Sequence, residues 1–166
     1  GGGAVGCGVA YALAKAGLKD IQLVERASDV GQVTTAQGAG LCGQARDSVE
    51  RVKLAMHSVA TFRELQRDPD ATPDWNEVGS LRVALSEKRA AELQRLQQAS
   101  TEAGLETALL DRPEASRLWP LMNFDRATAV LWVPSDGYMT PARVVKAFEH
   151  QAKKLGVRFH SSTPIE

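Results

Sequence analysis

Small, apolar and polar residues follow one another in blocks that predict helices and short strands. Residues 5–15 are small and apolar and end before Gly17, which is typical of a buried helix with a glycine stop. Residues 21–25 form a nearly continuous apolar run, which predicts a strand buried on both faces of a parallel sheet. Apolar residues then recur at helical spacing from residue 49 to 62, after a cap at Asp47 or Ser48.

The pattern changes after residue 75, where strands of the antiparallel type become frequent. Polar and apolar residues alternate in 78–85, and a charged helix follows that begins at Ser86 and stops at Gly104. Short apolar runs predict further strands at 105–110 and 129–133. Helix-type spacing followed by a strand returns after residue 137.

These changes predict an α/β fold in which one nucleotide-binding domain is interrupted by an α+β insertion. We assign residues 1–75 to the first part of that domain, residues 76–136 to the insertion and residues 137–166 to the return. The strand that should precede the first turn is not present, and the sequence does not begin with Met. We therefore expect a fragment of a longer protein, truncated at both ends.

The first six residues match the G-x-G-x-x-G pattern of dinucleotide-binding turns. Gly1 allows the tight turn, Gly3 lets the backbone approach a pyrophosphate, and Gly6 lets helix and sheet pack closely. The start of the next helix offers unpaired N–H groups to the phosphates. Glu25 stands about 20 residues further on, where an acidic side chain accepts hydrogen bonds from a ribose. Glycine-rich loops can share this pattern, so the helix and the acidic residue that follow are the stronger evidence.

A long polar and glycine-rich connection covers residues 27–43. Loops of this length inside a compact domain are usually functional, and Gly38 and Gly40 suggest that the backbone approaches another group closely. A mobile surface loop is the alternative. We favour a functional loop, because it follows the strand at the carboxyl edge of the sheet, where ligands bind.

Composition narrows the class of protein. Twenty basic and twenty acidic residues give the 166-residue chain no net charge, which gives no support for a nucleic-acid or anionic-membrane partner. No apolar run approaches the ~20 residues that span a bilayer. Cys7 and Cys42 lack the spacing of metal ligands, so we expect no metal and two free thiols, with a disulfide as the alternative. We predict an intracellular protein of cytoplasmic or mitochondrial-matrix type; the sequence does not decide the compartment.

No pair of side chains has the pattern of a catalytic base and nucleophile. His150 and His160 are isolated. We expect the tryptophans to pack in the core or between domains rather than to bind substrate. Arg82 lies in a predicted strand of the insertion, where it either meets a substrate carboxylate or faces solvent, the alternative that we favour. The catalytic residues therefore remain unknown, and we expect them beyond residue 166.

The chain as a whole resembles FAD-dependent oxidoreductases of the D-amino acid oxidase superfamily, and within them the sarcosine and dimethylglycine dehydrogenase branch. The resemblance extends along the whole chain in the right order. It rests on the glycine turn and on residues 23–26, 34–35, 39–41, 79–81, 118–122, 134–139 and 141.

This resemblance implies a discontinuous Rossmann-like FAD-binding domain, a substrate domain and a two-electron oxidation of a carbon–nitrogen bond. The substrate would be an amino acid or an N-methylated amine. The implied contacts are the pyrophosphate with Gly1, Gly3 and Gly6, the adenosine ribose with Glu25, and the flavin ring and ribityl chain with residues 34–41. The full set of implied FAD-binding residues is Gly1, Gly3, Ala4, Val5, Gly6, Glu25, Arg26, Thr34, Thr35, Gln37, Gly38, Ala39, Gly40 and Leu41.

One position departs from the family pattern. Members with covalently bound FAD usually carry a His two residues before the Ala-Gly-Leu of this loop, where this chain has Gln37. Because an amide cannot form the histidyl–flavin bond, we expect non-covalent FAD. Gln37 either donates a hydrogen bond to the ring or is a polar loop residue without flavin contact.

Two other functions stay open at this point: an NAD-dependent Rossmann dehydrogenase, and a non-catalytic regulatory subunit that keeps the FAD fold. The sequence determines neither the exact substrate, nor the electron acceptor (oxygen, a flavoprotein or a quinone), nor the oligomeric state. We further expect that the 166-residue chain alone binds FAD poorly, since the strand before the glycine turn and the closing strands of the domain are absent.

Overall fold

A computed structural model describes residues 1–165, and backbone contacts divide the chain into two compact units. The first unit contains Gly1–Leu41, Thr61–Asn76 and the described residues from Met139 onward. The second unit contains Cys42–Ala60 and Glu77–Tyr138. Residues 42–60 therefore group with the strand-rich part, whereas the sequence pattern assigned them to the first nucleotide-binding stretch. The functional assignment of the units stays a prediction.

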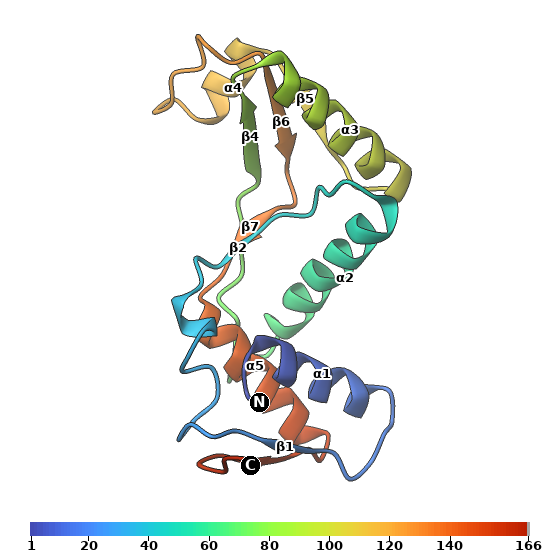
Figure 1. Ribbon diagram of the computed structural model, residues 1–166, viewed down its shortest axis with the longest axis vertical. Helices are drawn as coiled ribbons and strands as arrows, with labels where there is room; N and C mark the ends of the chain where they lie inside the picture. Colours follow the sequence, from blue (N-terminus) through green and yellow to red (C-terminus); the bar gives the residue numbers. More distant parts are fainter. Residues whose placement is uncertain (166) are drawn as a thin grey trace. The chain divides into compact units, whose positions relative to one another are not determined.

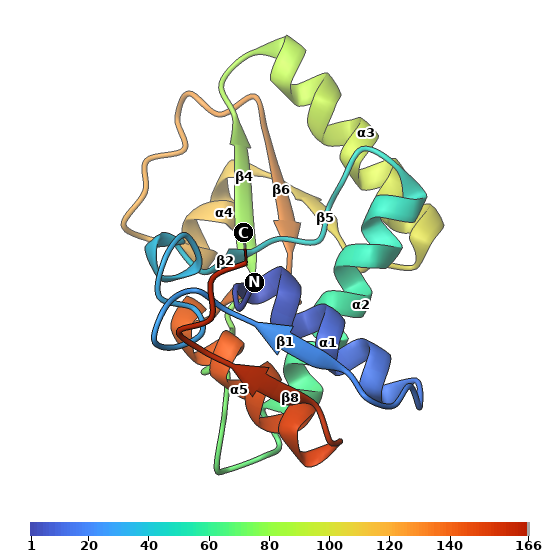
Figure 2. The ribbon, with the colours of Figure 1, turned by 60° about the horizontal axis from the view of Figure 1, so that its bottom comes forward.

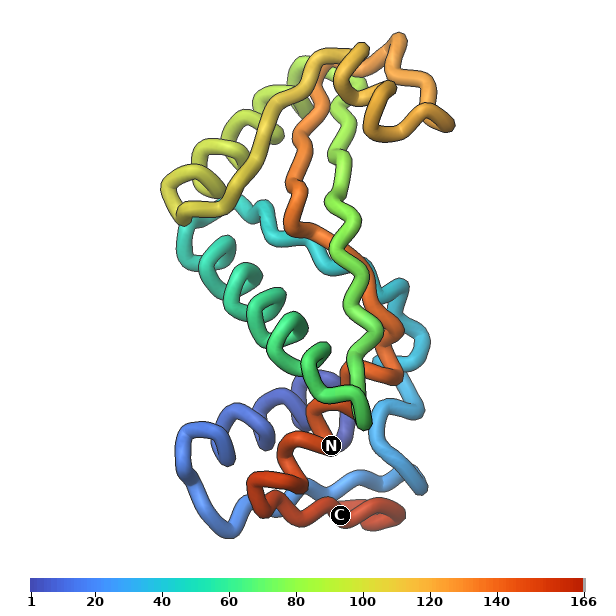
Figure 3. Tube along the Cα trace, turned by 180° about the vertical axis from the view of Figure 1, so that it is seen from behind, coloured from blue at the N-terminus to red at the C-terminus, as the bar shows by residue number. Residues whose placement is uncertain are grey.

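The first unit is a small α/β assembly. Helix α1 (Ala4–Lys15) leads to strand β1 (Gln22–Val24), and helix α5 (Pro141–Lys154) leads to strand β8 (Arg158–His160). The two strands pair in parallel, with Leu23 opposite Phe159, as the neighbouring arrows in Figure 2 show. The two helices lie against each other, which is visible from behind in Figure 3. The helix and the parallel strand expected near the N-terminus are thus confirmed.

Strand β1 differs from the expectation in its burial. Leu23 is buried, whereas Gln22 is exposed and Val24 is half-buried. The reason is that β8 is the partner of β1 among the described residues, so the strand is not enclosed by a wide sheet.

Aromatic rings form the core of the first unit. Phe148 of α5 lies 5.7 Å from Tyr11 and 6.5 Å from Phe62, measured between ring centroids, and Phe62 lies 5.9 Å from Trp75. Each pair of this kind contributes roughly 0.5–1.5 kcal/mol beyond the area it buries. These contacts connect segments that are far apart in sequence.

Helix α2 (Val49–Leu65) carries the buried stripe that its spacing predicts. Val52 and Val59 are almost fully buried. Ser48 is the cap, because its hydroxyl accepts a hydrogen bond from the Arg51 amide at 3.4 Å. Asp47 instead accepts from the Arg51 guanidinium at 2.8 Å.

The second unit contains an antiparallel sheet in the order β4-β6-β5, labelled in Figure 1. Its strands are β4 (Ser80–Ala84), β5 (Ala108–Leu110) and β6 (Ala129–Val133), and its helices are α3 (Glu87–Ala103) and α4 (Arg112–Leu118). The register pairs Arg82 with Leu131. The predicted strand at 78–85 is present but shorter, since β3 (Asn76–Glu77) ends before it and two residues separate them.

Each face of this sheet buries its own cluster. One cluster packs Ala84, Leu131 and Val133 against Leu93 of α3 and Val52 of α2. The opposite face carries a smaller cluster around Phe124 and Val130, next to α4. Residues two apart on one strand share a face, so Arg82 lies on the same face as Ala84.

The remaining elements are short. The connection at 27–43 is not wholly irregular, because it contains the 3₁₀ turn η1 (Thr35–Gln37) and ends in β2 (Leu41–Cys42). Strands β2, β7 (Gly137–Tyr138) and β3 form a sheet in the order β2-β7-β3. No disulfide joins Cys7 and Cys42, which agrees with the expectation. Within the described residues, no helix combines the length and the apolar character that crossing a membrane requires.

Candidate cofactor site

A cavity of about 500 Å³ opens at the N-terminal end of α1, within the first unit. Four residues of the long connection at 27–43 line it although no sequence motif marks them individually: Ala27, Gly31, Gln32 and Val33. The structure also brings together, on the same cavity, many of the predicted FAD-binding residues: Gly1, Gly3, Ala4, Val5, Gly6, Glu25, Arg26, Thr34 and Thr35.

The glycine turn is as tight as the motif predicts. A side-chain carbon at Gly6 would lie 1.9 Å from the carbonyl oxygen of Gly1, a separation that no real pair of atoms adopts. The turn is tied to the long connection, because the Gly31 amide donates to the Gly2 carbonyl at 2.8 Å. The glycines therefore place no side chain over the backbone of the turn, and this hydrogen bond holds the turn in position. Both features permit the close approach of a phosphate.

The first turn of α1 presents unpaired donors to this cavity. The Ala4 amide donates to the Thr35 hydroxyl oxygen at 3.1 Å, and the Cys7 amide donates to the Gly3 carbonyl at 3.0 Å. Among residues 1–165, no acceptor is recorded for the amides of Val5 and Gly6, both of which line the cavity. Free N–H groups at the positive end of a helix dipole are the arrangement that typically attracts an anion.

Glu25 lies at the end of β1 and faces the same cavity. Its carboxylate accepts hydrogen bonds from the Ala27 amide at 2.8 Å and from the Gly2 amide at 2.5 Å. These two backbone donors, that of Ala27 first, lower the pKa of the Glu25 carboxyl, so the group is charged at neutral pH. Each carboxylate oxygen keeps a lone pair for a further donor, such as a ribose hydroxyl.

The other predicted residues lie further along the chain and do not line this cavity. Gln37 ends the η1 turn, and the Gly38 backbone approaches Pro141 at the start of α5. The Met139 amide donates to the Gly40 carbonyl at 3.0 Å, and the Leu41 side chain is exposed. Contact of Gln37, Gly38, Ala39, Gly40 and Leu41 with a flavin therefore stays a prediction.

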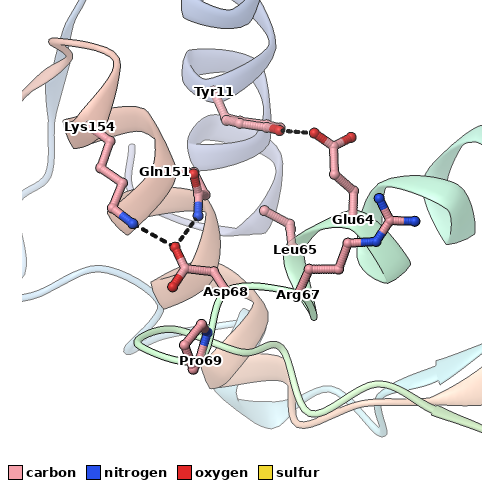
Figure 4. A pocket seen from close by; sticks show the side chains of 8 residues that line it. All are labelled: Tyr11, Glu64, Leu65, Arg67, Asp68, Pro69, Gln151 and Lys154. Carbon is pink, nitrogen blue, oxygen red and sulfur yellow. Dashed lines mark hydrogen bonds and ion pairs between the residues drawn. The ribbon is translucent and has the colours of Figure 1, made fainter.

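A second cavity of about 420 Å³, drawn in Figure 4, is lined by several polar side chains that pair with one another. The Tyr11 hydroxyl donates to Glu64 at 3.2 Å. Asp68 accepts from Lys154 at 2.7 Å and from Gln151 at 2.6 Å. The Lys154 ammonium, first among these donors, lowers the pKa of Asp68 to about 2. This arrangement holds the segment after α2 against α5.

One group of possible metal ligands lies beside this cavity. Oxygen or nitrogen atoms of Asp68, Asp70 and His150 lie within 4.8 Å of one another. The Lys154 ammonium already occupies the position that a cation would take at Asp68, at 2.7 Å. In this structure the Asp68 carboxylate is thus paired with a lysine, and the expected absence of a metal stays a prediction.

The fold and the glycine cavity together are typical of the class of α/β proteins that bind a nucleotide cofactor. The chain belongs to the FAD dependent oxidoreductase family, whose family model (DAO) matches residues 1–166. The predicted family, the α/β fold and FAD as the cofactor of the family are therefore confirmed.

The chain is 34% identical over 166 residues to human mitochondrial sarcosine dehydrogenase, and 28% identical over 165 residues to rat mitochondrial dimethylglycine dehydrogenase. It is 27% identical to the mouse mitochondrial pyruvate dehydrogenase phosphatase regulatory subunit over 165 residues. Each comparison covers 99% of this chain but 18–19% of the relative. The chain thus spans about a fifth of these relatives.

Solved structures agree on the fold. The L-proline dehydrogenase of P. horikoshii superposes with a TM-score of 0.89 at 23% identity, and covers 100% of this chain and 43% of its own. The glycine oxidase of Geobacillus kaustophilus superposes with a TM-score of 0.79 at 23% identity, over 99% of this chain and 46% of its own. At this identity the likeness concerns the fold alone.

Proposed function

We propose that the protein containing this chain oxidises the carbon–nitrogen bond of an amino acid or an N-methylated amine, of the sarcosine or dimethylglycine type. The observation that carries the proposal is the glycine cavity, with the free amides of Val5 and Gly6 and the charged Glu25 beside them. This cavity belongs to a chain that matches an FAD family over its full length. Relatives named for sarcosine and dimethylglycine oxidation support the substrate class.

In this proposal the first unit binds FAD and the second unit contributes to the substrate domain. The amides of Val5 and Gly6 and the bare backbone at Gly1 and Gly3 would bind the pyrophosphate. Glu25 would accept hydrogen bonds from the adenosine ribose, with Arg26, Thr34 and Thr35 beside them. When bound, FAD supplies the acceptor for the hydride, and the protein contributes position and electrostatics.

We also propose that FAD is held without a covalent bond, because Gln37 occupies the position where a histidyl link would form. Acid precipitation of the purified full-length protein tests this. The flavin should remain in the supernatant, and FAD chemically attached to the precipitate would contradict the proposal. The electron acceptor and an intracellular location stay predictions; the three named relatives are described as mitochondrial.

Anaerobic titration of the full-length protein with amines tests the activity. Sarcosine, dimethylglycine and D-amino acids are added in turn while flavin absorbance near ~450 nm is followed. Bleaching by at least one of these compounds is the expected result. A flavoprotein that none of them reduces would contradict the proposed oxidation.

A non-catalytic subunit is the second candidate function. It is favoured by the relative named as a phosphatase regulatory subunit, which matches the chain over the same 99% as the two dehydrogenases. Bound FAD that no amine reduces would support this candidate. An NAD-dependent dehydrogenase is disfavoured, because the family that matches is an FAD family.

A further inference from the structure

The connection that lines the cofactor cavity is attached to helix α5 through charged side chains, all of them in the first unit. The Lys146 ammonium donates to the Asp29 carboxylate and, at 2.9 Å, to the Glu149 carboxylate. Lys153 donates to the other oxygen of Glu149 at 2.7 Å. Negative and positive groups thus alternate from the connection to α5, and Lys146 is the group that joins the two.

Asp29 lies between two stretches of the cavity lining. Ala27 comes before it and the lining resumes at Gly31, whereas Asp29 is not itself a lining residue. One oxygen of its carboxylate also accepts from the Val30 amide at 2.8 Å, and Val30 is buried. The Lys146 ammonium lowers the pKa of the Asp29 carboxyl, so the group is charged at neutral pH. An ion pair that fixes Asp29 therefore fixes the cavity wall on either side of it.

Backbone packing next to this ion pair connects the same wall to two other elements. A side-chain carbon at Gly31 would lie 3.2 Å from the Val145 side chain, so the connection runs directly against α5 at this point. The Gly31 amide also donates to the Gly2 carbonyl at 2.8 Å. The wall thus lies between α5 and the glycine turn, and Lys146 attaches it to α5.

An exposed ion pair usually contributes little, and the side chains of this one are half exposed, 46% for Lys146 and 44% for Asp29. The second partner of Lys146 differs, because Glu149 is buried. A buried carboxylate requires paired cations, and this requirement restricts where the Lys146 ammonium can lie. The lysine therefore loses less side-chain entropy when it meets Asp29 than a free surface lysine would.

We propose that Lys146 is a positioning residue of the cofactor site, which holds Asp29, and with it residues 27–33, in the arrangement that admits FAD. Lys146 does not line the cavity and acts through Asp29 alone. The inference rests on the proposed function, because it takes the glycine cavity as the place where FAD binds. It adds that a helix distant in sequence, α5, controls the affinity of a cavity lined by residues 1–35.

Four single variants of the full-length protein and one double variant test this role. Lys146→Met removes the charge and keeps an apolar stem, whereas Lys146→Arg keeps a cation at the same place. Asp29→Asn removes the other charge and leaves α5 unchanged, so it serves alone if Lys146→Met fails to fold. Lys153→Met is the matched control, because Lys153 pairs with the same Glu149 from a position further along α5. The double variant combines Lys146→Met with Asp29→Asn, and circular dichroism establishes that each variant is folded.

The first measurement is the dissociation constant of FAD, obtained from flavin fluorescence with flavin-free protein at low salt and at about 1 M NaCl. At low salt we expect binding to weaken about 3–5-fold in Lys146→Met and in Asp29→Asn, and less than about 2-fold in Lys146→Arg and Lys153→Met. The double variant should be no weaker than either single variant, because both changes remove one ion pair. At high salt all variants should approach the wild type, since salt screens an exposed pair. A weakening that persists at high salt, or an equal one in Lys153→Met, would mean a purely structural role and would overturn the inference.

The rate of trypsin cleavage after Arg26, next to the same wall, is a second measurement and does not require that the flavin be removed. At low salt the rate should rise at least ~3-fold in Asp29→Asn and stay within about 2-fold of the wild type in Lys153→Met. If the flavin cannot be removed from the protein, these rates decide the inference, and equal rates overturn it.

The outcomes separate this inference from the proposed function. If the wild type and Asp29→Asn bind FAD equally at low salt, the positioning role is wrong while the cofactor site stands. If the wild type binds no FAD, the cofactor site is wrong, and the inference fails with it.

Discussion

A methyl group added at Gly6 would lie 1.9 Å from the carbonyl oxygen and 3.1 Å from the carbonyl carbon of Gly1. Real side-chain carbons essentially never come within 3.0 Å of another heavy atom, so the turn would have to open by about 1 Å. The neighbouring atom belongs to the backbone, so a side-chain rotation cannot relieve the overlap. Opening the turn would also displace the cavity in which we propose that the pyrophosphate binds.

Two opposing effects determine how much Gly6→Ala changes the free energy of unfolding. Overlap in a packed site costs about 1–3 kcal/mol, and backbone overlap lies at the upper end of that range. Alanine in a helix interior is about 1 kcal/mol more favourable than glycine, and Gly6 lies within α1. We therefore expect Gly6→Ala to lower the free energy of unfolding by about 2 kcal/mol.

Gly8 provides a matched control in the same helix. A side-chain carbon there would meet the Phe148 ring at 3.7 Å, an ordinary contact distance. Gly8→Ala should thus raise the free energy of unfolding by about 0.5–1 kcal/mol. Urea unfolding followed by circular dichroism compares both variants with the wild type, and FAD content of the full-length protein gives the second readout. A Gly6→Ala variant that is as stable as Gly8→Ala and retains its FAD would refute the argument from turn geometry.

Two other substitutions test the ion pair between Asp68 and Lys154 and the capping box at the start of α4. The pKa of Asp68 is about 2, below the ordinary value of about 3.9, because Lys154 stabilises the charged form. Its contribution to stability is therefore complete above about pH 4 and is lost as the pH falls through about 2. Asp68→Asn should be less stable than wild type at neutral pH, with a difference that disappears toward pH 2 in acid unfolding curves; a pH-independent difference would contradict this. Asp111 caps α4 and shares a capping box with Glu114, so Asp111→Ala should cost about 1 kcal/mol in urea unfolding. The exposed Asp125→Ala is the control, and an equal loss there would argue against the cap.

Features set by local spacing were predictable from the sequence. The glycine turn, its helix and Glu25 lie within 25 residues of one another, and each acts through backbone geometry that the residue type imposes. The stop of α3 at Gly104 and the start of α5 at Thr140 and Pro141 follow from the same kind of rule.

Features that depend on contacts between distant segments were not predictable. The Thr35 hydroxyl oxygen accepts a hydrogen bond from the Ala4 amide, 31 residues away in sequence. The Glu25 carboxylate, which faces the cavity, also accepts a hydrogen bond from the Gly2 amide. The burial of Arg82 depends on the sheet and helix packed around it, whereas its position in an alternating strand suggested solvent exposure. The grouping of residues 42–60 with the second unit depends likewise on tertiary contacts.

The central claim is that the glycine cavity holds FAD, and the cofactor of the purified full-length protein tests it most directly. The protein is denatured with acid, and the released nucleotide is identified by mass spectrometry and quantified against protein. We predict about one FAD per chain in the wild type, and a large loss in Gly6→Ala but not in Gly8→Ala. A nicotinamide nucleotide in place of FAD, or FAD that Gly6→Ala retains in full, would contradict the account.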